Sequence, residues 1–438
     1  MRTICKNTLL NVSEFKNQLL LWSQQFREVV FLDNNSTYNQ NQNYSTHDYV
    51  LAVDAFTSIK TDYVNSFQDL HQYQSQTKDW LFGYLSYDLK NDIEDLKSNN
   101  YDGLEFPDLF FFQPKKLFLV KDNQLEIHYL KMCDDEIDAD FKEISLKDVN
   151  FTTQIDTPKK VTVKQRISKE NYLSKVEKIL EHIHRGDIYE ANFCMEFFAE
   201  EATINPLEIY QKLNNISEPP FAVFFKNHTN FLLSASPERY LKKEGFKVIS
   251  QPIKGTAKRS NDVERDNSLK ATLKNDPKER SENIMIVDLV RNDLSKVAIN
   301  ASVKVEELCE IYSFKQVHQM ISTIVSEVEN STSPIEIIQT TFPMGSMTGA
   351  PKISAMNIIE KFEETKRGLY SGAMGYFTPN NDFDFNVVIR SILYNTKNQY
   401  LSFSVGSAIT SKSNTQNEYE ECLLKAKAML DVLGANNL

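Results

Sequence analysis

The sequence has no apolar run long enough to cross a membrane, and its first residues lack the apolar stretch of a signal peptide. Its five cysteines are scattered, without Cys-x-x-Cys spacing or histidine partners. This scarcity predicts free thiols in a reducing cytoplasm and argues against a zinc site or a disulfide framework. Positive charge is also in deficit, because the net charge is −11, and this disfavours a general nucleic-acid surface.

What is present is ordinary globular material, 438 residues with 41% apolar and 25% charged, enough for one large core or two fused lobes. Strand-like segments follow one another as hairpins, such as 117–120 with 125–130, and not in strict β-α-β alternation. The predicted fold class is therefore α+β with mainly antiparallel sheets. We expect an N-terminal lobe over 1–145, a charged join without periodicity over 132–165, and a second region over 165–435 that forms one unit with the first.

Helical periodicity and capping residues predict the main helices. Ser168 and Gly186 bracket an apolar stripe, which indicates a helix between them. Ser13 is expected to cap a first helix whose apolar positions run to Phe26, and the polar segment 34–48 reads as a surface loop. The other long helices are predicted at about 262–275, 278–294, 352–364 and 416–433.

One lysine stands on a constrained stretch of backbone. Pro252 and Gly255 bracket Lys254, directly after a strand-rich passage. A solvated lysine at a strand end is the simpler interpretation. The alternative is a catalytic amine, which needs burial or a neighbouring cation to lower its pKa from about 10.4.

A candidate acid lies on the other arm of a predicted hairpin. If the segments 232–239 and 248–254 pair around the turn at 244–245, Glu238 lies near Gln251 and about 10 Å from Lys254. That separation would let a carboxyl and an amine approach one six-membered ring from different sides.

The last predicted helix places Glu418, Glu421 and Lys425 in one stripe. A solvated face with a Glu421–Lys425 ion pair worth about 0.3–0.5 kcal/mol is the simpler interpretation. The functional alternative is a pair of Mg²⁺ ligands followed by a cation that binds substrate. The helix predicted at 278–294 also has acids near its start, where they complement the helix dipole. Small residues at 342–351 leave backbone N–H groups free for an anion, although the phosphate-loop pattern is absent.

Five motifs occur here in one order. They are Ser-Pro-Glu-Arg, Pro-Ile-Lys-Gly-Thr, Glu-Asn-x-Met-Ile-x-Asp-Leu-x-Arg-Asn-Asp-Leu, Gly-Ser-Met-Thr-Gly-Ala-Pro-Lys and Glu-Tyr-Glu-Glu-x3-Lys. The set resembles the chorismate-utilising enzymes, which include anthranilate, aminodeoxychorismate, isochorismate and salicylate synthases. The resemblance is dense over about 168–433 and thinner in the N-terminal lobe, where 83–88 matches best. It implies two mainly antiparallel sheets packed face to face, with helices outside and the site between the sheets.

The resemblance also implies roles for individual residues, with chorismate as substrate and Mg²⁺ as cofactor. The implied metal ligands are Glu282, Glu418 and Glu421. The implied catalytic residues are Lys254 and Glu238, the latter as general acid for the C4 hydroxyl. The implied substrate-binding residues are His318, Thr348, Tyr370, Arg390, Gly406, Ala408 and Lys425. Chorismate is a dianion, so an acidic protein must gather cations, loop amides and a metal at one place to hold it.

Lys254 distinguishes branches of this family. Water-using members carry lysine at the position of Glu190, and anthranilate synthases read Pro-Ile-Ala-Gly-Thr where this chain has Lys254. The lysine is similar to aminodeoxychorismate synthase component I. That likeness implies attack of the amine, its pKa lowered by Mg²⁺ and partial desolvation, on C2 with loss of the C4 hydroxyl. Ammonia then attacks C4 and expels the lysine, giving 4-amino-4-deoxychorismate for p-aminobenzoate and folate synthesis.

Ammonia is expected from a separate protein, because the chain has no Gly-x-Cys-x-Gly elbow of a cysteine glutaminase. The implied partner is a glutamine amidotransferase subunit in a transient heterodimer. One departure from the family pattern is Ala408, where many relatives have glycine; its methyl could narrow the pocket. The alternatives are an anthranilate synthase component I and a non-catalytic chorismate-binding regulator, against which the intact Glu238 and Lys254 argue.

Overall fold

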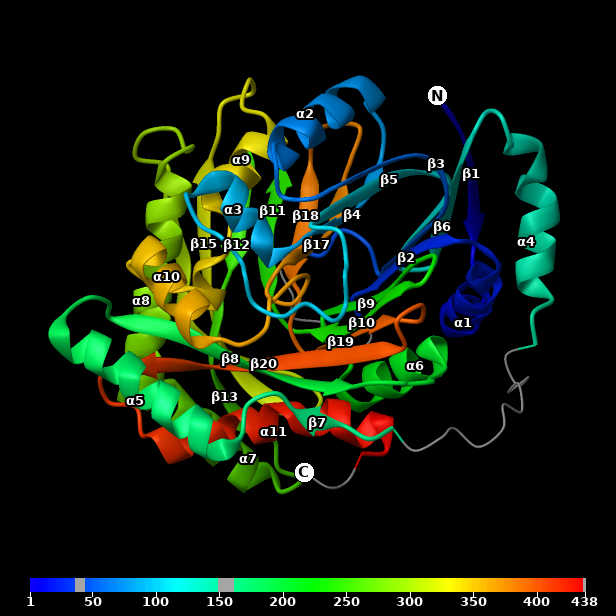
Figure 1. Ribbon diagram of the computed structural model, residues 1–438. Helices are drawn as coiled ribbons and strands as arrows, with labels where there is room; N and C mark the ends of the chain where they lie inside the picture. The colour runs from blue at the N-terminus through cyan, green and yellow to red at the C-terminus, as the bar shows by residue number, and fades with distance from the viewer. Residues whose placement is uncertain (36–43, 149–160, 436–438) are drawn as a thin grey trace.

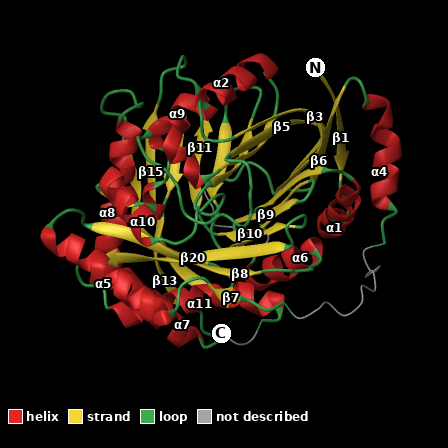
Figure 2. Cartoon of the chain, viewed as in Figure 1, coloured by secondary structure: helices red, strands yellow, loops and turns green. Residues whose placement is uncertain are grey.

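A computed structural model gives the structure of residues 1–35, 44–148 and 161–435, with helices outside and strands inside (Figures 1 and 2). The helices are α1 (Val12–Trp22), α2 (Ser66–Thr77), α3 (Lys90–Ile93), α4 (Ile137–Ser145), α5 (Lys169–Arg185), α6 (Pro206–Ser217), α7 (Val263–Asn275), α8 (Pro277–Ser295), α9 (Pro334–Thr341), α10 (Lys352–Phe362) and α11 (Thr415–Leu433). The strands are β1 (Arg2–Thr8), β2 (Glu28–Asp33), β3 (Tyr49–Thr61), β4 (Leu81–Leu85), β5 (Leu109–Lys121), β6 (Gln124–Leu130), β7 (Lys164–Gln165), β8 (Glu190–Ala199), β9 (Phe221–Asn227), β10 (Asn230–Ser236), β11 (Arg239–Glu244), β12 (Lys247–Gln251), β13 (Ile253–Lys258), β14 (Lys304–Ser313), β15 (Val317–Glu327), β16 (Gly349–Ala350), β17 (Ala373–Phe377), β18 (Phe383–Val387), β19 (Ser391–Asn395) and β20 (Tyr400–Thr410).

The strands pair antiparallel, which confirms the predicted α+β class with mainly antiparallel sheets. From β3 the pairing runs through β2, β9, β10, β19 and β20 to β8. From β5 it runs through β4, β17, β18, β11 and β12 to β15. Because β3 also pairs with β5, the two expected sheets are joined into one hydrogen-bonded network with two halves.

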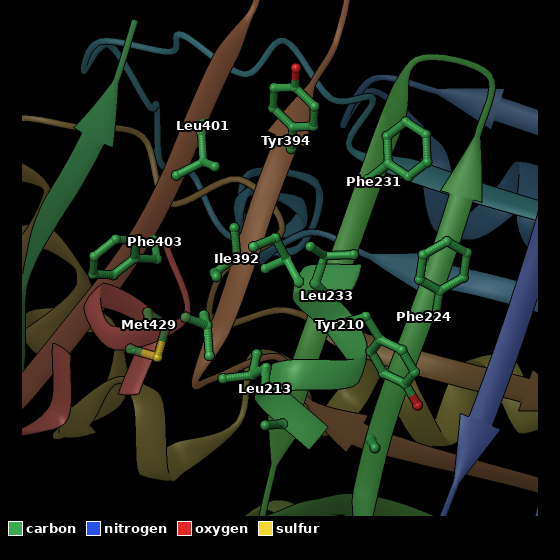
Figure 3. Close-up of a cluster of buried hydrophobic side chains, with 14 of the residues drawn as sticks. Tyr210, Leu213, Phe224, Phe231, Leu233, Ile392, Tyr394, Leu401, Phe403 and Met429 are labelled. Atoms are coloured by element: carbon green, nitrogen blue, oxygen red, sulfur yellow. The ribbon is translucent and has the colours of Figure 1, made fainter. Parts of the chain in front are cut away.

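Two large apolar clusters hold the layers together. One combines side chains from both halves of the network and lies between them. The other lies between the β8–β20–β19–β10–β9 half and the helices that cover it. Figure 3 shows part of this second cluster, where Leu213 of α6 and Met429 of α11 lie over the strands and Tyr210 packs 5.6 Å from Phe224, centroid to centroid.

Strand β8 shows how the sequence positions the site. It is buried along its whole length. Its apolar alternate residues, such as Phe193 and Met195, belong to the cluster under the helices. Since successive side chains in a strand point to opposite faces, Glu190, Asn192 and Glu196 face the interior between the two halves. Glu190, at the start of the strand, is the member of this polar set that contacts Lys254.

The N-terminal lobe contributes strands to the same network, because β2 pairs with β9 and β4 pairs with β17. The segment after β4 ends in Asp88, which is 1% exposed. Its carboxylate accepts a hydrogen bond from the Gly368 N–H (2.8 Å) and lies 3.3 Å from the Lys90 ammonium. These contacts tie the best-matching N-terminal motif to the loop that leads into β17.

Several predicted boundaries hold and others shift. The α5 caps are as expected, since Ser168 accepts from the Asn171 N–H and Gly186 has φ of 91°. The cap of α1 is Asn11 and not Ser13, because the Asn11 side chain accepts from the Glu14 N–H, and the helix ends before Phe26. The join over 132–165, predicted to lack periodicity, contains α4. Most of the polar loop, residues 36–43, lies outside the described residues. Among the helices that the structure describes, none is long and apolar enough to span a membrane.

Candidate active site

Strand β13 carries Lys254 beside a bulge. Its pairing with β15 shifts register between Ile253 and Thr256. Gly255 lies at this shift with φ of +93°, a conformation that L side chains rarely adopt, and an added Cβ would come within 3.1 Å of the Glu279 carboxylate. The glycine therefore permits the bulge at the residue next to Lys254.

The Lys254 side chain points into the interior, where it forms an ion pair with Glu190 of β8. The Nζ–Oε1 distance is 3.0 Å, and the two side chains are 12% and 1% exposed. The interpretation of Lys254 as a solvated surface lysine is therefore wrong.

The expected lowering of the Lys254 pKa is also wrong for this state of the protein. Burial by itself lowers the pKa, but the charges of Glu190 and Glu282, the hydrogen bond to Glu190 and the charge of Glu238 together raise it. Lys254 is thus held as an ammonium ion, and its use as a nucleophile needs a proton acceptor.

Glu238 lies in the connection between β10 and β11, and it is 4% exposed. The register Arg239↔Gln251 places it within one residue of the predicted hairpin position. Burial raises the pKa of its carboxyl to about 7, although Ser346, Lys254 and Arg390 act in the opposite direction. Glu238 can therefore be protonated near neutral pH, as a general acid requires.

A small cavity of about 20 Å³ adjoins Glu238 and is lined by Pro252, Thr341 and Ser346 among others. This volume is enough for about one water molecule. The Ser346 hydroxyl lines the same cavity and lowers the pKa of the Glu238 carboxyl.

Three carboxylates predicted as metal ligands surround Lys278 of α8. The Lys278 Nζ lies 3.8 Å from Glu282 and 3.9 Å from Glu418, and the charge of Glu421 acts on the same ammonium. Burial raises the pKa of Glu282 to about 7, and its buried Oε1 has no hydrogen-bond partner among the described residues. Within the described chain, no three such side chains are grouped closely enough to hold a metal ion.

Lys425 connects α11 with β20. Its ammonium lies 2.7 Å from the Glu421 carboxylate, which is the ion pair expected from their spacing, and it donates to the Gly406 carbonyl at 2.8 Å. Glu418, one helical turn before Glu421, accepts a hydrogen bond from the Ser407 hydroxyl. The stripe predicted on α11 therefore contacts strand β20 at two consecutive residues.

Strand β20 brings two predicted substrate-binding residues opposite β8. Gly406 pairs with Cys194, and Ala408 pairs with Asn192. A Cβ on Gly406 would come 2.7 Å from the Cys194 sulfur, so this position requires glycine. Tyr370 adjoins the same place, with its hydroxyl 3.8 Å from the Cys194 sulfur.

Thr348 follows the 3₁₀ turn Gly345–Met347 and is fully buried. Its hydroxyl donates to the Gly345 carbonyl at 3.2 Å, and its own carbonyl accepts from the Asn192 N–H at 2.8 Å. The loop predicted to bind an anion is thus attached to the interior strand β8.

A buried ion pair fixes this attachment. Arg367 lies 2.7 Å from Glu363 and donates to the carbonyls of Met347 (2.6 Å) and Asn192 (2.7 Å). Glu363 in turn accepts from the Cys194 N–H at 2.8 Å. Such charge-assisted hydrogen bonds hold backbone groups in one geometry. The sequence reasoning missed both residues, because neither belongs to a motif that signals chemistry.

Arg390 and His318, the two remaining predicted substrate-binding residues, differ in the groups that surround them. Arg390 is close enough to Glu238 for the charges to interact, and burial lowers the pKa of its guanidinium. His318 of β15 is 1% exposed, and its ring nitrogens contact Ser313 (2.8 Å) and Asp266 (3.1 Å). The structure thus places Arg390 beside the candidate acid, whereas both His318 nitrogens are engaged within the protein.

Comparison with known proteins gives the family. A family model described as chorismate binding enzyme matches residues 21–431. The chain belongs to this family. Within the fold of this family member, Lys254, Glu238 and acidic residues of α8 and α11 lie close enough for their charges to interact.

Relatives within the chorismate-binding family carry more than one name. The chain is 33% identical over 387 residues to the probable chloroplastic aminodeoxychorismate synthase of Oryza sativa, covering 80% of this chain but only 43% of that protein. It is 32% identical over 357 residues to aminodeoxychorismate synthase component 1 of Bacillus subtilis (79% and 75% covered). It is 30% identical over 391 residues to anthranilate synthase component 1 of Saccharolobus solfataricus (89% of each).

A solved structure has the same fold. Anthranilate synthase component I from Streptococcus pneumoniae superposes with a TM-score of 0.78 at 25% identity, covering 89% of this chain and 93% of that one. The likeness confirms the architecture expected from the motifs. The relatives thus carry the names of two different synthases, aminodeoxychorismate synthase and anthranilate synthase.

Proposed function

We propose that the chain is an aminodeoxychorismate synthase component I, which converts chorismate and ammonia to 4-amino-4-deoxychorismate. The observation that carries the proposal is the buried position of Lys254, ion-paired with Glu190 and close to the protonatable Glu238. A lysine kept out of solvent between an acid and a base is arranged for covalent catalysis and poorly suited to a surface role. The relatives named aminodeoxychorismate synthase support the same reaction.

In the proposed mechanism the Lys254 amine attacks C2 of chorismate, and the C4–O bond breaks as the ring double bonds shift. Glu238 donates its proton to the departing hydroxyl, which leaves as water. Ammonia then attacks C4, the C2–N bond breaks, and Glu238 accepts a proton from the new ammonium group. Arg390, the 342–351 loop and Lys425 bind the carboxylates of the substrate.

Mg²⁺ is the proposed cofactor, and Glu282, Glu418 and Glu421 are its proposed ligands. Their oxygens are the hard ligands that Mg²⁺ prefers, and the buried Oε1 of Glu282, which has no hydrogen-bond partner among the described residues, supports this assignment. When bound, Mg²⁺ would supply positive charge to hold a carboxylate of chorismate. Lys278, which contacts two of these carboxylates, would have to move aside.

Ammonia is proposed to come from a glutamine amidotransferase subunit that binds this chain transiently. The component 1 names of relatives support a separate second component. The proposed compartment is the cytoplasm, which agrees with five cysteines that are free in the structure.

The identity of the product tests the proposed function. The purified protein, given chorismate, Mg²⁺ and ammonium chloride, is expected to form 4-amino-4-deoxychorismate, detected by mass spectrometry after chromatography. Anthranilate, recognised by its fluorescence, would instead assign the chain to the alternative branch. Unchanged chorismate with tight binding would support the non-catalytic regulator.

Removing one proposed metal ligand should weaken Mg²⁺ binding. We expect Glu421→Ala to raise the dissociation constant for Mg²⁺ at least about tenfold, measured by calorimetry without substrate. Glu420→Ala is the matched control, because Glu420 is the adjacent residue on α11, is exposed and contacts Gln416. Equal Mg²⁺ affinity in both variants would remove Glu421 from the proposed ligand set.

A further inference from the structure

Glu190 is a buried carboxylate with only part of its hydrogen-bonding capacity used. Its Oε1 accepts from Lys254, while its Oε2 is buried and has no partner among the described residues. Glu196, on the same face of the same strand, shows the contrast, because its carboxylate accepts from Arg166, Tyr400 and Ser402. A carboxylate left under-satisfied in the interior costs free energy, which suggests a role other than stability.

We propose that Glu190 is a further catalytic residue, the base that removes a proton from Lys254 before attack and returns it when the lysine is released. This inference rests on the proposed function, since it concerns the nucleophile of that reaction. The Nζ of Lys254 is the reacting atom, and Glu190 lies within hydrogen-bond reach of it at 3.0 Å.

The surroundings of Lys254 make such a base necessary. Glu190 faces it from β8, Glu282 and Glu279 from α8, Glu238 from the β10–β11 connection, and Glu421 from α11. These negative charges keep the lysine protonated, and a protonated amine has no lone pair for attack. Among these carboxylates, Glu190 is the one recorded as a hydrogen-bond acceptor of Nζ.

The proton balance closes over the two steps. First, Glu190 takes one proton from the Lys254 ammonium, leaving a neutral amine and a neutral carboxylic acid. The amine lone pair forms the bond to C2, the C4–O electron pair leaves on oxygen, and Glu238 supplies the proton that completes water. After ammonia has bonded to C4, the C2–N electron pair returns to the lysine nitrogen. Glu190 gives its proton back, which restores the starting ion pair.

The same residue explains a departure within the family resemblance. Water-using synthases are expected to have lysine at this position, where a base would activate water. In this chain residue 190, on β8, is a glutamate, and the lysine that contacts it is Lys254 on β13. The Glu190–Lys254 pair therefore contains one proton acceptor and one amine, and in the proposed reaction the amine is the nucleophile.

The test compares Glu190→Gln with wild type, using formation of the covalent adduct as the readout. Protein is mixed with chorismate and Mg²⁺ without ammonia, quenched over time and analysed by intact mass for addition of chorismate minus water. Glu190→Gln is expected to form the adduct about 10²–10⁴-fold more slowly at neutral pH. Glu190→Asp keeps a carboxylate and should recover part of that rate.

A second measurement distinguishes a Glu190 that accepts the proton of Lys254 from a Glu190 that only stabilises the ammonium by its charge. Competitive acetylation of Lys254 with acetic anhydride across pH, followed by peptide mass spectrometry, reports where this amine loses its proton. Glu190→Gln is expected to shift that titration to lower pH while the adduct still forms slowly. If the variant has the freer amine and forms the adduct as fast as wild type or faster, the inference is overturned.

Two controls make the outcomes distinct. Glu196→Gln removes a buried carboxylate from the same face of β8, far along the strand from Lys254, and should leave adduct formation within about threefold of wild type; thermal unfolding checks that each variant is folded. A wild-type protein that forms neither adduct nor amino product defeats the proposed function together with the inference. An adduct that forms equally in wild type and Glu190→Gln defeats the inference alone.

Discussion

Lys254→Ala is expected to lower the rate of amino-product formation from chorismate and ammonium by at least about 10³-fold, because it removes the nucleophile from a two-step covalent mechanism. Chorismate binding should change much less, since the proposed carboxylate-binding groups stay in place. The rate of product formation is measured by chromatography with mass detection, and binding is measured by calorimetry.

The matched control is Lys243→Ala. Lys243 is another buried strand lysine with an acidic partner, Asp382 at 3.3 Å, and it lies outside the proposed site. Lys254→Ala also leaves Glu190 buried without its cation, a change that costs about 3–5 kcal/mol when a buried pair is broken. The double variant Lys254→Ala with Glu190→Gln should recover stability but not activity. A Lys254→Ala protein as active as wild type would contradict the mechanism.

Glu238→Gln is expected to lower kcat by about 10²–10⁴-fold, because glutamine keeps the shape of the side chain but cannot donate the proton to the departing hydroxyl. The direction in which kcat/KM changes with pH provides a second test of this role. Burial raises the pKa of Glu238 to about 7, so the protonated, active form dominates below that pH. Wild-type kcat/KM should therefore fall as pH rises through about 7, and the residual activity of Glu238→Gln should lack this limb.

Glu244→Gln provides the comparison for this variant. Glu244 ends the same strand β11, is exposed and pairs with Lys242 at 3.0 Å, so its loss should leave both rate and pH profile unchanged. A Glu238→Gln enzyme that keeps the descending limb near pH 7 would assign that limb to another group. Glu238 would then lose its role as general acid.

Local signals predicted much of the fold. The Ser168 and Gly186 caps of α5 follow from rules that act over a few residues, and the structure confirms them. The β11–β12 hairpin also forms as predicted, but Arg239 and not Glu238 pairs with Gln251. Helix α4 was missed because it is short and its apolar residues stand among charged ones, although Ile137, Phe141 and Ile144 have helical spacing and pack on the cluster beneath the helices. The cap of α1 moved because two neighbouring residues could both fill that role.

The site was harder to predict, because its energetics depend on pairs far apart in the sequence. Lys254 and Glu190 are 64 residues apart, and only the folded chain shows that they form an ion pair. Without that partner, burial and a metal seemed to lower the lysine pKa, whereas the surrounding carboxylates raise it. Lys278 was likewise unremarked, since its place between Glu282 and Glu418 depends on how α8 packs near α11.

The most direct test of the account is peptide mapping of the protein after exposure to chorismate and Mg²⁺ without ammonia. We expect an adduct of chorismate minus water on the peptide containing Lys254, which disappears when ammonium is added and 4-amino-4-deoxychorismate is released. Formation of amino product at full rate with no adduct on Lys254, or an adduct that ammonium cannot discharge, would contradict it.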